Sequence, residues 1–242
     1  WLWGDGFLSP GGPEEVASML DGVELSGFHV LDVGCGLGVV DVLLAERYGA
    51  ASVVGVDVEG HLIESAIERV AKANLQAKVS FRLVEPGPLP FDDETFDVLF
   101  SKDAIVHMPD KAAFYREALR VLKPGGRFIG SDWLRGDETT FTARAREWLD
   151  VVHLNFEMQD LDHTQTAMTA VGFDVERMND RNEWYQGEIA NELATLSGDR
   201  FAGLVELIGE EEANYRLRSS QLKQQAIDDG FLRPTHFVAH KR

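Results

Sequence analysis

The sequence predicts an α/β fold in which parallel strands alternate with helices. Short runs rich in Val, Ile, Leu and Phe alternate with segments whose apolar residues recur every three or four positions, which is the pattern of βαβ units. The first of these runs ends in three alternating glycines, a turn that leads from a strand into a helix. We therefore expect a Rossmann-like, doubly wound sheet of seven strands, mostly parallel with an antiparallel last strand, together with a helical lid or insertion.

The first five strands are expected at the most apolar runs of the chain. These runs are 28–33, 52–56, 79–84, 96–100 and 127–131. The helices are expected at 13–20, 38–48, 61–73 and 111–122. In the third helix Ile63, Ile67 and Val70 fall on one face, and Glu64 and Glu68 fall on the opposite one, so one side faces the core and the other faces solvent.

The alternation weakens after the turn signal Lys-Pro-Gly-Gly at 123–126. Helices are expected at 139–153 and 162–171, a sixth strand at 173–177, and a charged, helix-rich stretch at 188–229 with breaks at Gly198 and Gly209. A last strand that follows such a long connection is consistent with an antiparallel partner of strand six. We interpret residues 1–242 as one domain: a core at about 13–135, a helical lid and extension at about 136–230, and a last strand at about 234–241.

The composition argues against several classes of protein. The 242 residues carry 23 Lys and Arg against 41 Asp and Glu, a formal net charge of −18. Proteins that bind nucleic acid or anionic membrane surfaces rely on an excess of basic residues. No apolar run reaches the roughly 18 residues of a membrane-spanning helix, and the single cysteine, Cys35, fits a reducing compartment. We expect a small-molecule partner, no nucleic acid, no membrane and a cytoplasmic location, and the charge leaves the oligomeric state open.

The glycine turn and two nearby acids predict a cofactor site. Gly34 and Gly36 follow a strand directly, where the absence of a side chain lets a ligand approach the backbone at a positive helix end. Asp57 ends the next strand about twenty residues later, where a carboxylate can accept both hydroxyls of a ribose. Asp32 can contact the ammonium of an aminoacyl sulfonium ligand, or it only braces the loop. For Gly34, Gly36 and Asp57, the alternative is a purely structural turn followed by a solvated acid.

Several phrases together resemble the class I S-adenosylmethionine-dependent methyltransferases. The glycine turn matches motif I and Asp57 matches the acid of motif II, while LPFDDETFDV at 89–98 and LKPGG at 122–126 match two further phrases of the class. The resemblance covers residues 28–134 and implies S-adenosyl-L-methionine as cofactor, S-adenosyl-L-homocysteine as product and no metal. It also implies cofactor contacts from residues that follow the strands: Val58, Glu85, Pro86 and Ser101. For Glu85, beside the adenine, the alternative is a surface acid in a loop.

The segment after the fourth strand holds the candidate catalytic residues. Ligands of such sheets bind beyond the carboxyl ends of the strands, where Asp103 and His107 stand four positions apart. One helical turn would place both on the same face. The carboxylate can orient an amine, and the imidazole can accept its proton. The alternative is that His107 only packs against the next helix.

A closer resemblance extends over nearly the whole chain. The phrases SKDAIVHMPDK at 101–111, WGDGFLSPGG at 3–12 and SDWLRG at 131–136 are similar to the phosphoethanolamine N-methyltransferases and their sarcosine and dimethylglycine relatives. This resemblance implies that Ser9 contacts the cofactor, that Asp103 and His107 contact the substrate amine and remove its proton, and that a cation near Arg218 holds the phosphate. The lid tyrosine of that family lies upstream of the stretch that matches Trp1.

The sequence departs from that family where the phosphate is held. Trp133, Trp148 and Phe156 stand in the region of the family's tyrosines, and no arginine there has a confident match. The loss of phenol donors and of a forked cation weakens the grip on phosphate. The aromatic side chains suit a methylated, cationic nitrogen through cation–π contact, although aromatic residues at helical spacing are also ordinary core residues.

The sequence therefore supports one leading function and two alternatives. The leading function is N-methylation of a small amine, phosphoethanolamine-like or sarcosine- and dimethylglycine-like, with His107 as base. The first alternative is O- or C-methylation of an apolar natural product, suggested by the tryptophans. The second is a cofactor-binding module without catalysis. The seven histidines and one cysteine show no metal-ligand spacing.

Overall fold

A single sheet of seven strands organises the computed structural model, which describes residues 3–152, 158–198 and 200–242. The strands are β1 His29–Val33, β2 Ser52–Asp57, β3 Val79–Leu83, β4 Phe96–Lys102, β5 Leu122–Arg135, β6 Phe173–Asp180 and β7 Leu232–Lys241. Their order in the sheet is β3-β2-β1-β4-β5-β7-β6. Strands β1 to β5 pair in parallel, and β7 runs antiparallel to both of its neighbours, β5 and β6. The predicted fold class is confirmed.

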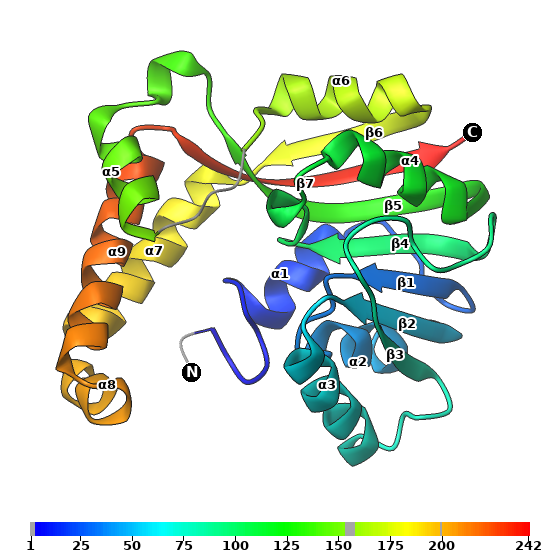
Figure 1. Ribbon diagram of the computed structural model, residues 1–242, viewed down its shortest axis with the longest axis horizontal. Helices are drawn as coiled ribbons and strands as arrows, with labels where there is room; N and C mark the ends of the chain where they lie inside the picture. The colour runs from blue at the N-terminus through cyan, green and yellow to red at the C-terminus, as the bar shows by residue number, and fades with distance from the viewer. Residues whose placement is uncertain (1–2, 153–157, 199) are drawn as a thin grey trace.

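Helices cover both faces of the sheet and one of its ends. They are α1 Gly12–Met19, α2 Val39–Glu46, α3 Gly60–Lys72, α4 Lys111–Val121, α5 Ala143–Val152, α6 Leu161–Val171, α7 Asn182–Ser197, α8 Phe201–Ile208 and α9 Glu210–Asp228, with short 3-10 helices at Ile105–His107 and Glu138–Thr140. Helices α4 and α6 lie on one face, and α1, α2 and α3 lie on the other (Figure 1). Helices α5, α7, α8 and α9 form a separate group beyond the carboxyl ends of the parallel strands (Figure 1). No helix in the described ranges is both long and apolar enough to cross a membrane.

The inner strands β1, β2 and β4 consist mainly of apolar residues, as expected where helices cover both faces of a sheet. On β1, Leu31 points into the core beneath α4 and α6, and its neighbour Val30 points into the core beneath α1 and α2. The helical group beyond the sheet has its own core, in which Trp148, Tyr185 and Phe231 are all nearly inaccessible to solvent. This third core fixes the helical group against the edge of the sheet where the site lies.

One predicted break is absorbed into a strand. The segment 123–126 was expected to be a turn before the fifth strand, but β5 runs through it. The register shifts there: Phe96 pairs with Leu122, whereas Val98 pairs with Arg127. Gly125 takes a left-handed φ of 75°, so the Pro-Gly-Gly sequence forms an irregularity inside the strand.

The glycine turn gives a test of the fold. Gly34 has φ +82°, and a Cβ there would lie 2.3 Å from Cβ of Ala104, whereas Gly22 has a similar φ of +73° with nothing within 4 Å. We expect Gly22→Ala to lower the free energy of unfolding by about 1 kcal/mol through backbone strain. Gly34→Ala should cost a further 1–3 kcal/mol or so through overpacking. Denaturant unfolding measures both, and equal costs would contradict the close packing of Gly34 against Ala104.

Candidate functional site

The glycine turn is tied to the end of β2 by a carboxylate. The backbone N–H of Gly36 donates to Oδ2 of Asp57 at 2.9 Å, and the N–H of Glu59 donates to Oδ1 at 3.1 Å. Ser101 supports the turn from β4, because its hydroxyl donates to the carbonyl of Val33 at 2.8 Å. Asp57 therefore faces the turn, as its position at the end of the second strand predicts.

A first cavity lies against this turn, and we call it the glycine-turn pocket. Its lining comes from the N-terminal segment, the turn with the start of α2, and the end of β4: Gly6, Phe7, Leu8, Ser9, Asp32, Gly34, Cys35, Gly36, Leu37, Val39, Val40 and Lys102. Four predicted cofactor residues thus meet here: Ser9, Asp32, Gly34 and Gly36. Asp32 is only 2% exposed and its Oδ1 has no hydrogen-bond partner, so the wall contains a buried acceptor suited to a ligand's donor.

The other predicted cofactor residues do not line this pocket. Val58 is 51% exposed, and Glu85 and Pro86 are exposed as well. Val58 follows β2, and Glu85 and Pro86 come shortly after β3. These two parallel strands end side by side, because Asp57 of β2 pairs with Leu83 of β3. The structure therefore places them together at the same end of the sheet, on the solvent side.

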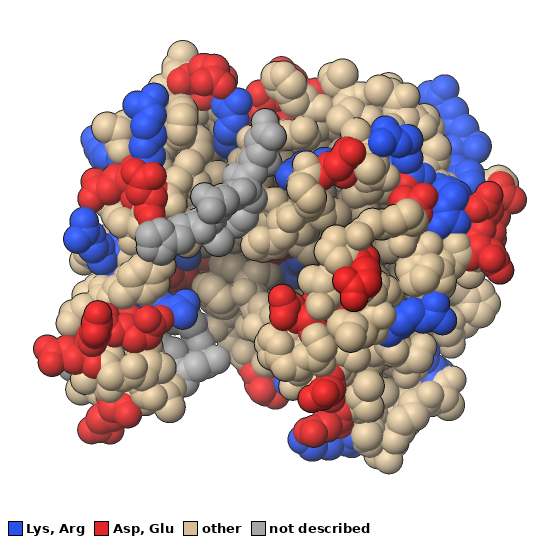
Figure 2. Space-filling view, in the orientation of Figure 1, with Lys and Arg blue, Asp and Glu red and all other residues tan. Residues whose placement is uncertain are grey.

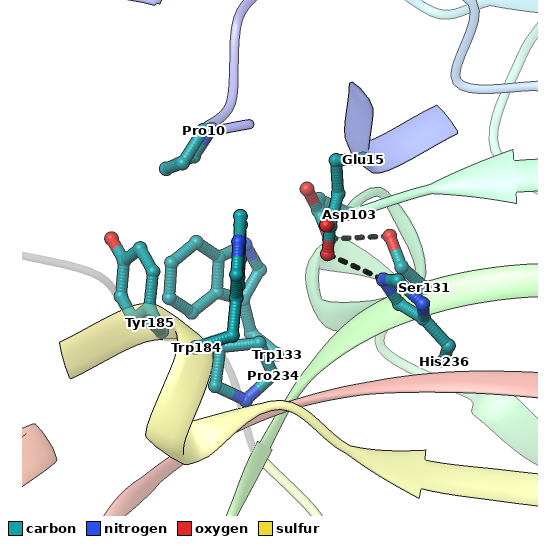
Figure 3. A pocket seen from close by; sticks show the side chains of 9 residues that line it. All are labelled: Pro10, Glu15, Asp103, Ser131, Trp133, Trp184, Tyr185, Pro234 and His236. Carbon is teal, nitrogen blue, oxygen red and sulfur yellow. Dashed lines mark hydrogen bonds and ion pairs between the residues drawn. The ribbon is translucent and has the colours of Figure 1, made fainter. Parts of the chain in front are cut away.

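A second cavity, which we call the aromatic pocket, lies next to the first. It is lined by Pro10, Glu15, Asp103, Ser131, Trp133, Trp184, Tyr185, Pro234 and His236. Figure 3 shows the three aromatic rings on one side and the polar side chains on the other. The rings of Trp133 and Tyr185 meet edge to face with centroids 5.0 Å apart. In Figure 2 the surface is hollowed between the helical group and the sheet.

Lys102 and Asp103 stand between the two pockets. Lys102 Nζ donates to Asp103 Oδ2 at 2.8 Å and to the carbonyl of Pro10 at 3.2 Å, and it also contacts the hydroxyl of Ser9. The hydroxyl of Ser131 donates to the other oxygen of Asp103 at 2.7 Å. Lys102 lines the glycine-turn pocket and Asp103 lines the aromatic pocket. One ion pair therefore forms the partition between them.

Burial and charge act in opposite directions on Asp103. Its side chain is 12% exposed and that of Lys102 is 6% exposed. Burial raises the pKa of Asp103, but the Lys102 charge and the hydrogen bonds to the carboxylate more than offset this, so the pKa lies below its ordinary value. Asp103 is thus an anion whose charge is already paired.

The expectation that Asp103 and His107 share one regular helical turn is wrong. Asp103 has a left-handed φ of 58°, and the 3-10 helix begins only at Ile105. His107 is exposed and is not among the residues that line either pocket. Partial burial and the charge of Lys111 lower the pKa of His107, against the opposing effect of Asp103. The imidazole is therefore neutral near pH 7, the form that can accept a proton.

Three residues predicted to contact substrate lie elsewhere or outside the described chain. Trp148 is 4% exposed within the core of the helical group, which corresponds to the ordinary core alternative. The side chain of Arg218 is 65% exposed and pairs with Glu147 at 3.2 Å. Neither lines a pocket, and Phe156 lies outside the described residues. The inward-facing cation of α9 is Lys223, which is 14% exposed and 3.1 Å from Glu192.

The aromatic pocket also contains residues that sequence reasoning missed. Oε1 of Glu15 lies 2.5 Å from Nε2 of His236, and Oε2 accepts from Arg181 at 2.9 Å. Burial raises the pKa of Glu15, but hydrogen bonds from His236 and Arg181 bring it below its ordinary value. The one available signal was His236, a histidine in the middle of the predicted last strand. Trp184 and Tyr185 gave none, because adjacent aromatic residues on a helix are common in cores.

Removal of Lys102 should expose the cost of burying Asp103. We expect Lys102→Met to lower the free energy of unfolding by about 3 kcal/mol at neutral pH. The loss should shrink as the pH falls, because without Lys102 the burial of Asp103 favours its protonated form. The matched control is Lys123→Met, because Lys123 pairs with Asp97 at the same 2.8 Å but at 37% exposure. This control should cost about 1 kcal/mol or less. Equal, pH-independent losses in chemical denaturation would contradict a buried anion at position 103.

Comparisons with known proteins agree on the family. Residues 24–195 match the family described as methyltransferase domain. Phosphoethanolamine N-methyltransferase 3 of Arabidopsis thaliana is 30% identical over 200 residues, which are 82% of this chain and 40% of that protein. The chain thus spans about two fifths of the length of this curated relative.

Two solved structures share the fold. Phosphoethanolamine N-methyltransferase 2 of Haemonchus contortus, in complex with phosphomonomethylethanolamine and S-adenosylhomocysteine, has a TM-score of 0.90 at 24% identity and covers 100% of this chain and 55% of its own. A putative sarcosine dimethylglycine methyltransferase of Galdieria sulphuraria has a TM-score of 0.82 at 22% identity, over 94% of this chain and 82% of its own. The chain belongs to the methyltransferase-domain family.

Proposed function

We propose that this chain is an S-adenosylmethionine-dependent methyltransferase that acts on a small amine. The observation that carries the proposal is the contact between the two pockets. Ser9 and Lys102 line the glycine-turn pocket, while their neighbours Pro10 and Asp103 line the aromatic pocket. A donor held in the first pocket and an acceptor held in the second would meet at this partition, and such alignment is what direct methyl transfer chiefly requires.

The residues around the glycine-turn pocket fit the cofactor. Asp32 offers a buried, unpartnered oxygen for an ammonium group, and Asp57, at the end of β2, can accept ribose hydroxyls. The exposed Val58, Glu85 and Pro86 would border the adenine, and Ser9 would close the pocket from the N-terminal segment. When bound, S-adenosylmethionine supplies a methyl group on a positively charged sulfur.

The aromatic pocket fits a nitrogen that becomes positively charged. Trp133, Trp184 and Tyr185 present aromatic rings, which attract cations. The carboxylates of Asp103 and Glu15 lie on the opposite side (Figure 3). Asp103 would orient the amine, and His107 would accept its proton before or during attack. Helices α5, α7, α8 and α9 would act as the lid that excludes water.

The same pocket favours one second candidate. Its three aromatic rings and two prolines would also suit an apolar acceptor, so O- or C-methylation of an apolar small molecule is the alternative. Such an acceptor would not depend on Asp103 as a counter-ion.

A ligand screen separates these functions. Thermal shift with S-adenosylhomocysteine present would be measured for phosphoethanolamine, sarcosine, dimethylglycine and phenols, followed by methyl transfer from S-adenosylmethionine to each stabilising compound. We expect at least one amine to stabilise the chain and to be methylated. Methylation of phenols alone would support the second candidate. Binding of the cofactor product without any transfer would support a non-catalytic cofactor-binding module.

Asp57 is expected to contribute to the affinity for the cofactor. Asp57→Ala should weaken S-adenosylhomocysteine by about tenfold or more, since hydrogen bonds to a charged acceptor are worth about 1.5–3 kcal/mol. Asp92→Ala, an exposed acid beyond β3, is the matched control and should leave the affinity unchanged. Isothermal titration calorimetry measures both. Unchanged affinity in Asp57→Ala would refute the ribose assignment.

His107 is expected to set the acid limb of the rate profile. A base must be deprotonated, and the pKa of His107 lies below the ordinary 6.5, so kcat/KM should rise with pH and the midpoint of this rise should lie below that value. His107→Ala should lower turnover by about 100-fold or more while it leaves S-adenosylhomocysteine affinity intact. A variant that keeps both its rate and its acid limb would remove His107 from the mechanism.

A further inference from the structure

A second acid, Asp41, lies directly behind Asp32. Asp41 is in the first turn of α2 and is completely buried, and neither of its carboxyl oxygens has a hydrogen-bond partner among the described residues. Its carboxyl group acts on that of Asp32 at a range where the two can share a proton. The space for its carboxyl group comes from Gly55, where a Cβ would lie 2.6 Å from Oδ1 of Asp41. Gly55 is the register partner of Asp32 between β1 and β2. The fold thus holds two carboxyl groups against each other beneath the glycine-turn pocket.

No cation compensates this pair within the described residues. None of the ion pairs formed there involves Asp32 or Asp41, and the other charged group that acts on both is the carboxylate of Asp57. The remaining titratable neighbour, the Cys35 thiol, has its own pKa raised by burial and by these acids. Two buried carboxylates in contact cannot both be ionised. Burial and the charge of Asp32 raise the pKa of Asp41 well above its ordinary value.

We propose that Asp41 is a positioning residue that keeps a proton and donates it to Asp32, so that the pair carries one negative charge. The donated hydrogen bond occupies one side of the Asp32 carboxylate. Asp32 lines the glycine-turn pocket, and the oxygen that does not accept this proton would be the acceptor for the ammonium group of a bound amino acid moiety. This last step rests on the proposed function, whereas the shared proton does not.

A proton held by Asp41 in the folded chain would make the stability of the fold decrease as the pH rises. In the unfolded chain Asp41 ionises near its ordinary pKa of 3.8, but in the folded chain it stays protonated. The folded state therefore loses stability as the pH rises above that value. Asn has nearly the same shape and donates a hydrogen bond without a proton to lose. Asp41→Asn should become more stable relative to the parent as the pH rises from about 4 to about 8.

Chemical denaturation across this pH range tests the shared proton. The control Asp92→Asn changes an exposed acid and should show no such trend. A variant that becomes progressively less stable than the parent as the pH rises would show that Asp41 is ionised, and it would overturn the proposal. If Asp41→Asn does not fold, infrared spectroscopy at neutral pH should still show a protonated carboxyl group in an Asp132→Asn background. That background is needed because burial also raises the pKa of Asp132, to about 8. Absence of the band would overturn the proposal.

Two ligands test whether Asp41 acts through Asp32. Asp41→Leu removes the donor and keeps the branched shape of the side chain, and it should weaken the binding of S-adenosylhomocysteine by about tenfold. The same variant should leave the affinity for methylthioadenosine, which lacks the amino acid moiety, unchanged. Asp41→Asn should have an affinity for S-adenosylhomocysteine close to that of the parent chain. If the variant binds both ligands more weakly by the same factor, Asp41 has only a structural role. Failure of the parent chain to bind either ligand would refute the proposed function. The shared proton would still be tested by the stability and infrared measurements.

Discussion

The ion pair between Lys102 and Asp103 is the interaction on which the arrangement of the site depends. It joins the end of β4 to the N-terminal segment through Ser9 and Pro10, and to β5 through Ser131. Because Lys102 lines one pocket and Asp103 lines the other, the pair separates the two pockets and would set the distance between ligands held in them. Its two side chains are almost fully buried, so the loss of either partner would leave an uncompensated charge.

The site illustrates three ways of keeping a carboxyl group in a protein interior. Asp103 is an anion paired with a lysine, and Glu15 is an anion paired with an arginine and hydrogen-bonded to a histidine. Asp32 and Asp41 have no such partner in the described ion pairs, and we infer that a proton takes its place. Burial of a charge is costly unless it is paired or neutralised, so these different solutions point to different roles for acids that look alike in the sequence.

The sequence predicted those parts of the molecule that depend on local patterns. The strands, the antiparallel last strand and the glycine turn follow from periodicity and from residues within about twenty positions of one another. The aromatic pocket could not be predicted in this way, because Glu15 and His236 meet only after the whole sheet has formed. Trp148 and Arg218 lie away from both pockets, because a family resemblance indicates the helix but leaves open which side of it faces the site. Nothing in the sequence distinguishes Asp41 from a solvated acid at the start of a helix.

A crystal structure of the chain with S-adenosylhomocysteine would test the central claim most directly, since the position of the sulfur shows where a methyl group would be delivered. The account predicts that the ligand lies in the glycine-turn pocket, that its ammonium group contacts Asp32, and that its sulfur faces the partition formed by Lys102 and Asp103. A sulfur directed away from this partition, or a ligand bound outside the glycine-turn pocket, would contradict the claim that the two pockets form one methyl-transfer site.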